Sequence, residues 1–108
     1  MPTSLTLDTA RRSDGQVVLT ATGEIDLSNV DAFSQALRTA SIEAGSDGGT
    51  LTVDLSAVEY LDSAAINVLF ARADDIRLIA HPLVVPILSI SGLTELVAVE
   101  PAPPPAEG

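Results

Sequence analysis

The segment from Val53 to Leu69 constrains this chain most, because it predicts a buried strand, a short loop and a helix in direct succession. The strand is predicted over 50–55, where the residues are apolar enough for a central position in a sheet. The helix is predicted to begin at Ser63 and to run to about Arg72. A serine at a helix N-terminus can be a cap, a phosphoacceptor or a nucleophile, since free N–H groups and the helix dipole favour an anion there.

The rest of the chain alternates between strand and helix patterns, and the dipeptide Asp14-Gly15 is a hairpin signal. This alternation predicts a single α/β domain with a mixed sheet of about four to five strands, flanked by about three to four helices. The further predicted strands are 5–7, 16–22 and 76–80; the further predicted helices are 28–43, capped by Ser28, and 82–90, with Pro82 at its first position and Gly92 beyond its end.

Charge and composition narrow the classes of partner. The net charge is −10, and the five basic residues are all Arg. A chain this acidic repels phosphate backbones and anionic lipid surfaces, so neither nucleic acid nor a membrane is expected as a partner. The chain has no cysteine and therefore no disulfide. Its first residues lack the blocks of a signal peptide, so the expected location is the cytoplasm.

The single histidine limits the chemistry available to Ser63. His81 has no second ligand at useful spacing, so no metal site is expected. The same lone histidine disfavours a Ser-His-Asp hydrolase, and the absence of lysine excludes a P-loop. A carboxylate phosphoacceptor of the response-regulator type also needs a lysine, so this kind of site is disfavoured as well. The interpretations that remain for Ser63 are a helix cap and a phosphoacceptor, so we expect no enzymatic activity and no cofactor.

A second polar segment, Gly23-Glu24-Ile25-Asp26, ends the strand that precedes the first predicted helix. In a parallel sheet this segment and Asp62-Ser63 both lie at carboxyl ends of strands, where the sites of α/β proteins usually form. Ser63 and Asn67 are four residues apart, so they share one exposed face of the second helix. These two segments are therefore the candidate functional site.

Taken in order, these motifs resemble the STAS domain, and within it they look most like the bacterial anti-sigma factor antagonists. The resemblance covers residues 5–99, and the proline-rich segment 100–108 is expected to be a disordered tail. In that family the first serine after the aspartate is phosphorylated, and this position is Ser63. The motifs that carry the resemblance are Gly23-Glu24-Ile25-Asp26, Asp54-Leu55-Ser56, Tyr60-Leu61-Asp62-Ser63, Pro82 and Ser91-Gly92-Leu93.

The resemblance implies a partner switch. The unphosphorylated antagonist binds an anti-sigma factor that is also a serine kinase, and it thereby frees a sigma factor for transcription. The kinase then phosphorylates Ser63, the complex falls apart, and a PP2C-type phosphatase resets the protein. The partner-binding residues implied in this way are Glu24, Asp26, Asp62, Ser63 and Asn67.

Three features depart from the family pattern. Ala64-Ala65 replaces Ser/Thr-Gly, and the connection from Ser63 to Pro82 is shorter than usual. Both leave open a STAS-type module for protein interaction or small-ligand sensing that is not phosphorylated. The third helix is apolar on nearly all sides and contains Pro86, which should kink or shorten it. Such a helix is either buried or a contact surface, so a weak homodimer or an unusual partner is a further hypothesis.

Overall fold

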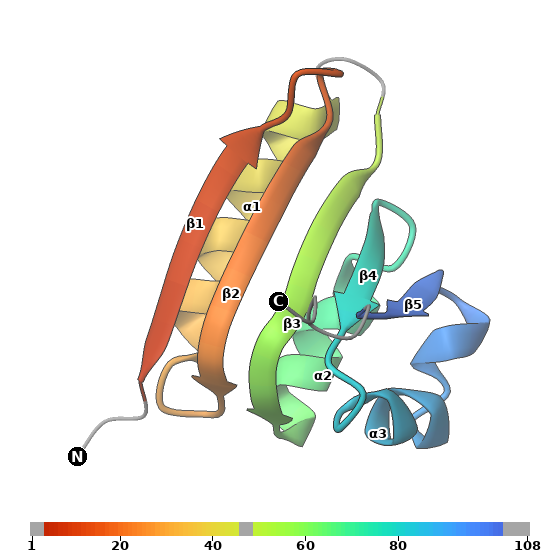
Figure 1. The fold of residues 1–108 in the computed structure, drawn as a ribbon. Coiled ribbons are helices and arrows are strands. Elements are labelled where there is room, and N and C mark those ends of the chain that lie inside the picture. Colours follow the sequence, from red (N-terminus) through yellow and green to blue (C-terminus); the bar gives the residue numbers. More distant parts are fainter. Residues whose placement is uncertain (1–3, 46–48, 103–108) are drawn as a thin grey trace, which may run out of the picture.

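Five strands form one mixed sheet in the computed structural model, which describes residues 4–45 and 49–102 (Figure 1). The strands lie side by side in the order in which they occur along the chain. β1 is antiparallel to β2, and the remaining neighbours are parallel. This is the α/β fold predicted from the sequence. The strands are β1 Leu5–Arg11, β2 Val17–Ile25, β3 Leu51–Leu61, β4 Ile76–Ala80 and β5 Val99–Pro101.

Three α-helices and one short 3-10 helix, among the residues described, connect the parallel strands. Figure 1 shows α1 and α2 on the same side of the sheet, with α3 near the end of the sheet where β3 leads into α2. A parallel pair of strands needs such a crossover, because the chain must return to the starting edge of the sheet. The helices are α1 Val30–Gly45, α2 Ser63–Ala71, α3 Val85–Ile90 and the 3-10 helix η1 Leu93–Glu95.

The hydrophobic core lies between the sheet and the helices. Along β2 the alternation of side chains buries Leu19, Ala21 and Ile25 and leaves Thr22 and Glu24 exposed. The helical spacing of apolar residues predicted one buried face for α1, and this prediction is confirmed. The buried residues of α1 are Val30, Phe33, Leu37, Ala40 and Ala44.

Two predicted boundaries before the second helix are wrong. A short loop was predicted after Leu55, but β3 continues to Leu61, because its second half pairs with β2. The first helix begins at Val30 and does not include Ser28. The Ser28 hydroxyl instead donates a hydrogen bond to the Asp26 carboxylate in the preceding turn. Serine competes in this way for local partners outside helices.

The third helix is shorter than predicted. It begins at Val85, so the prediction that Pro82 opens it is wrong. Pro86 lies within the first turn, where a missing N–H leaves no helical hydrogen bond unmade. The proline therefore shortens the helix, which is one of the two predicted outcomes. Gly92 follows the helix end with a φ of 88°, as predicted for a left-handed cap.

Two further predictions, the hairpin at Asp14-Gly15 and the disordered tail, concern the two edges of the sheet. The hairpin predicted by Asp14-Gly15 is present, with Gly15 at a φ of 88° and the Asp14 carboxylate accepting from the Gln16 N–H at 2.9 Å. At the other edge, Glu100 and Pro101 belong to β5, so the sheet extends into the segment predicted as a disordered tail. The rest of that segment, 103–108, lies outside the described residues.

Candidate functional site

The carboxyl ends of β2 and β3 lie side by side at one end of the sheet, because the strands are parallel and Ile25 pairs with Leu61. The residues that follow each strand are the two segments selected from the sequence. Asp26 begins the loop that leads to α1, and Asp62 joins β3 to α2 (Figure 1). The structure therefore brings the two predicted segments together, although about 35 residues separate them in the chain.

Asp62 connects the two segments through both oxygens of its carboxylate. Oδ1 accepts a hydrogen bond from the Ala65 N–H at 3.1 Å, which caps the start of α2. Oδ2 accepts from the Leu27 N–H at 2.9 Å, which fixes the loop after β2. The Asp62 N–H in turn donates to the Ile25 carbonyl at 3.2 Å. One aspartate thus holds the helix start and the neighbouring loop in a fixed relative position.

Ser63 is the first residue of α2, and its side chain is exposed. The interpretation of Ser63 as the helix cap is wrong, because the capping bond comes from Asp62. The Ser63 hydroxyl therefore lies outside the capping interaction, at the positive end of a nine-residue helix. Negative charge added to this hydroxyl would be close to the helix dipole and adjacent to the Asp62 carboxylate.

The loop after β2 is held by its own side chains. The Asn29 side chain accepts from the Asp26 N–H and donates to the Glu24 carbonyl, both at 3.0 Å. The Asp26 carboxylate accepts from the Ser28 N–H at 2.9 Å. The Glu24 side chain is exposed, beside a register shift in the pairing of β2 with β3. The loop is therefore a defined surface next to Ser63.

The exposed face of α2 extends this surface. Asn67 lies one turn after Ser63 and is exposed, whereas Ala65, Ile66 and Leu69 are buried against the core. The structure thus places Ser63 and Asn67 on one face, as their spacing predicted. We call Glu24, Asp26, Asp62, Ser63 and Asn67 together the Ser63 surface.

Sequence reasoning missed two residues of this region. Leu27 is 78% exposed, and its N–H donates to Asp62, so an exposed apolar residue lies next to the aspartate that precedes Ser63. Asn29 supplies the two side-chain hydrogen bonds that shape the loop. The signal for Asn29 was its position three residues after Asp26, a spacing at which an Asn side chain can close a turn.

Asp62 should be measurably important for stability. Replacing Asp62 by Asn leaves one oxygen acceptor for two N–H donors, so we expect the free energy of unfolding to fall by about 1–2 kcal/mol. Urea denaturation followed by circular dichroism would measure this loss. Asp74→Asn, an equal charge change in the exposed turn after α2, is the control and should have little effect. Equal losses for the two variants would contradict the bridging role of Asp62.

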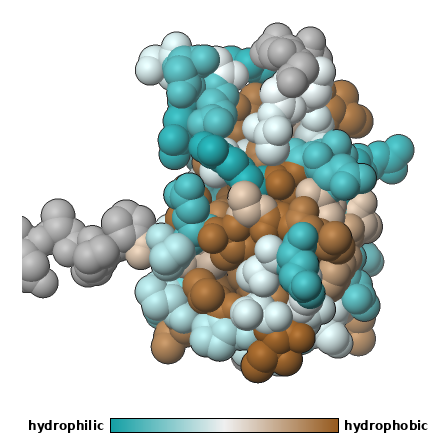
Figure 2. Space-filling model, turned by 90° about the vertical axis from the view of Figure 1, so that its right-hand side faces the viewer, coloured by the Kyte–Doolittle hydropathy of each residue, from teal (hydrophilic) through white to brown (hydrophobic). Residues whose placement is uncertain are grey.

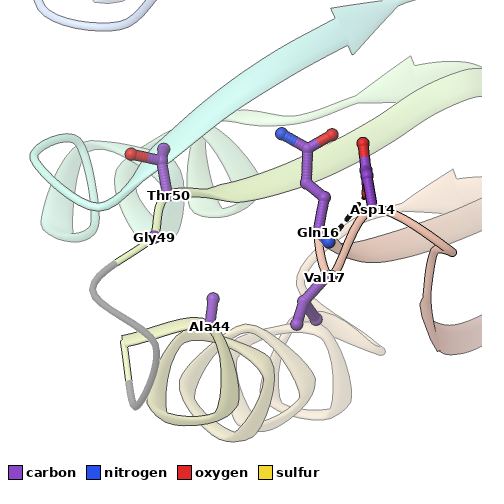
Figure 3. A pocket seen from close by; sticks show the side chains of 7 residues that line it. Asp14, Gln16, Val17, Ala44, Gly49 and Thr50 are labelled. Carbon is purple, nitrogen blue, oxygen red and sulfur yellow. Dashed lines mark hydrogen bonds between the residues drawn. The ribbon is translucent and has the colours of Figure 1, made fainter.

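A cavity of about 430 Å³, whose lining residues Figure 3 shows, lies at the opposite end of the sheet from Ser63. It lies where β2 and β3 begin, between the β1–β2 hairpin and the end of α1. Asp14 is the only ionisable side chain among its described lining residues, and it already bonds to the Gln16 backbone. Among the described lining residues, no charged group is therefore aimed at a ligand. Its lining residues are Asp14, Gly15, Gln16, Val17, Ala44, Gly49 and Thr50.

Residues 4–45 and 49–102 contain neither a candidate metal site nor a candidate membrane-spanning helix. No group of three His, Asp or Glu side chains in this part of the chain could hold a metal ion. None of its helices is both long and apolar enough to cross a membrane.

Similarity to known proteins agrees with the fold. A crystal structure of an anti-sigma factor antagonist from Mycobacterium paratuberculosis is 27% identical, with a TM-score of 0.77; the match covers 90% of this chain and 86% of that one. The anti-sigma factor antagonist SpoIIAA in its unphosphorylated form has the same fold at 20% identity, with a TM-score of 0.64 over 93% of this chain and 89% of that one. No curated protein sequence is similar enough to count as a match. The family model described as "Mlab, STAS domain" matches residues 9–98, and the chain therefore belongs to this STAS family.

Proposed function

We propose that this protein is an anti-sigma factor antagonist that is switched off by phosphorylation of Ser63. In its unphosphorylated form it binds an anti-sigma factor that is a serine kinase, and it releases the sigma factor for transcription. The kinase then phosphorylates Ser63, and a PP2C-type phosphatase removes the phosphate. In this proposal the protein is a substrate in the bacterial cytoplasm and has no catalytic activity of its own.

The observation that carries the proposal is the exposed Ser63 hydroxyl beside a capping aspartate. The Asp62 carboxylate makes the capping hydrogen bond of α2, so the Ser63 hydroxyl can contact another protein while the helix stays capped. The loop 26–29, which includes Leu27, follows β2 and is fixed by hydrogen bonds to Asp62 and to the Glu24 carbonyl. An exposed leucine next to fixed polar groups is typical of a protein contact, in which an apolar centre is surrounded by a polar rim.

Phosphorylation at this position should change the surface more than the fold. A phosphate adds about −1.5 to −2 charges and lies at the start of α2. The helix dipole stabilises such a charge by about 0.3–1 kcal/mol. A partner surface fitted to a neutral hydroxyl would instead face a phosphate next to Asp62. We therefore infer that the protein stays folded while the complex dissociates.

Phosphotransfer from the kinase would test this proposal. The purified protein is incubated with ATP and a serine-kinase anti-sigma factor encoded beside its gene, and the modified residue is located by mass spectrometry. We expect one phosphate, on Ser63, and none on the Ser63→Ala variant. Phosphate on another residue, or equal incorporation into both proteins, would contradict the proposed phosphorylation site.

The second candidate is a STAS-type module for protein interaction or small-ligand sensing that is not phosphorylated. Ala64-Ala65 favours it, because Ala65 is fully buried beneath the Asp62 cap and the helix already begins at Ser63. Alanine stabilises a helix relative to glycine by about 0.8–1 kcal/mol per residue, so this helix start is stiffer than one that contains glycine. Binding to the anti-sigma factor with no phosphate transfer under any condition would support this candidate.

A further inference from the structure

The surface around α3 exposes an unusual number of large apolar side chains. Leu88 is the only residue of α3 that is buried, although the helix is apolar on nearly all sides. Figure 2 shows hydrophobic side chains gathered on the face of the molecule that lies on the right in Figure 1, where α3 and β5 are. We call the following residues the α3 patch: Leu83 (69% exposed), Ile87 (41%), Ile90 (86%) and Leu96 (61%).

The patch residues lie close together along the chain and in space. Ile87 and Ile90 are three residues apart, which places them on one side of α3, and Leu83 lies in the turn just before the helix. Leu96 follows η1, and η1 packs against α3. Apolar residues grouped in this way on a surface usually mark a site of interaction, whereas single exposed ones do not.

Three of the four residues of the α3 patch, Leu83, Ile87 and Ile90, lie in a segment without formal charge, whereas Leu96 follows the exposed Glu95. No Asp, Glu, Lys or Arg occurs from His81 to Thr94, although 15 of the 108 residues are acidic. In a chain with a net charge of −10, a solvated surface would be expected to share this acidity. Acidic residues are thus missing from the segment that exposes Leu83, Ile87 and Ile90, and Glu95 is the one acidic neighbour of the patch in sequence.

We propose that the α3 patch is the contact surface for a second copy of this chain. In a twofold dimer each surface meets its own copy, so an acidic residue in the contact would face an equal negative charge. Two chains of net charge −10 can therefore approach most easily where each carries least charge, which is the side of Leu83, Ile87 and Ile90. A basic partner would favour the opposite arrangement, with acidic residues around the patch. The proposal involves no residue of the Ser63 surface.

The proposed dimer should be weak and should strengthen with salt. Four exposed side chains make a contact smaller than the roughly 1,200 Å² at which stable interfaces begin. The chains repel each other through their net charge, and added salt screens that repulsion over about 10 Å at 0.1 M. We therefore expect the dissociation constant to decrease as salt is raised. An interface held by ion pairs would respond in the opposite direction.

Sedimentation equilibrium of the full chain is the first test. We expect a concentration-dependent dimer, and we expect Ile90→Glu to weaken it at least about tenfold, since the substitution places a charge on each side of the contact. Ile42→Glu is the matched control, because Ile42 is 67% exposed on α1 and should leave the dimer unchanged. A strict monomer at about 1 mM, a dimer weakened by salt, or equal effects of the two variants would overturn the proposal.

Cross-linking gives a second test that does not depend on weakening the contact. The chain has no cysteine, so a single introduced cysteine can react only with its own copy. Ser89→Cys places a thiol at an exposed position of α3, and Thr39→Cys places one at an exposed position of α1. We expect the interchain disulfide to form about tenfold faster for Ser89→Cys, because the contact raises the effective concentration of the thiols. Equal rates would contradict a contact through α3.

Discussion

Replacing Ser63 by Glu is expected to weaken binding to the proposed partner, a serine-kinase anti-sigma factor, by about a hundredfold or more, which corresponds to about 3 kcal/mol. The glutamate adds a negative charge next to Asp62 and near the loop that begins at Asp26. In the complex, a partner surface fitted to the neutral hydroxyl would have to accommodate this charge. Like charges about 4 Å apart across the contact would repel by up to about 4 kcal/mol at an effective dielectric constant of about 20. Calorimetric titration of the two proteins with the anti-sigma factor would measure the difference.

Two control variants distinguish the effect of a charge at position 63 on the affinity from the effect of the net charge alone. Thr39→Glu adds the same charge at an exposed position of α1 and should bind nearly as tightly as the native protein. Ser63→Ala removes the hydroxyl without adding charge and should retain most of the affinity. If Ser63→Glu binds as tightly as the native protein, the proposed switch at Ser63 is wrong.

Replacing Gly23 by Ala is expected to lower the free energy of unfolding by about 3 kcal/mol. Gly23 has a φ of 115°, a conformation that residues with a Cβ rarely adopt. A Cβ at this position would also overlap the Ser4 carbonyl oxygen, which accepts a hydrogen bond from the Glu24 N–H at 3.1 Å. Relief of the overlap would therefore move the backbone that positions Glu24. Urea denaturation would measure the loss.

Substitutions at two other glycines distinguish the cost of the positive φ from the cost of the overlap with Ser4. Gly15 has a φ of 88° but nothing within 4 Å of a built Cβ, so Gly15→Ala should show only the backbone strain, about 1 kcal/mol. Gly45 has neither constraint and ends α1, so Gly45→Ala should be neutral or slightly stabilising. We expect the order Gly23, Gly15, Gly45 from most to least destabilising. Equal losses at Gly23 and Gly15 would show that the contact with Ser4 is unimportant.

The regular elements were largely predictable because their sequence patterns are local. The apolar spacing of 28–43 gave the buried face of α1, and the run 76–80 gave β4 with its observed bounds. The glycines at 15 and 92 marked turns because a positive φ favours glycine. In each of these cases the physical cause acts within a few residues of the chain.

The errors arose where neighbours distant in sequence decide the structure. β3 continues to Leu61 because β2 supplies backbone partners for its second half, and sequence periodicity does not reveal such a partner. Asp62 and Ser63 are both good caps, so their order alone could not show which one caps α2. The first helix begins after Ser28 because the Asp26 and Asn29 side chains shape a turn before it. Pro86 lies at the start of α3, where Pro82 was predicted.

The sequence by itself determined the α/β class, the candidate serine and the excluded chemistries, because these depend on local periodicity and on which residue types are present. Only the tertiary structure showed that Asp62 links the Leu27 N–H to the start of α2 and leaves Ser63 exposed. Only the tertiary structure showed that the apolar side chains of α3 remain uncovered. Both depend on which segments pack together, and packing between distant segments is set by the whole fold.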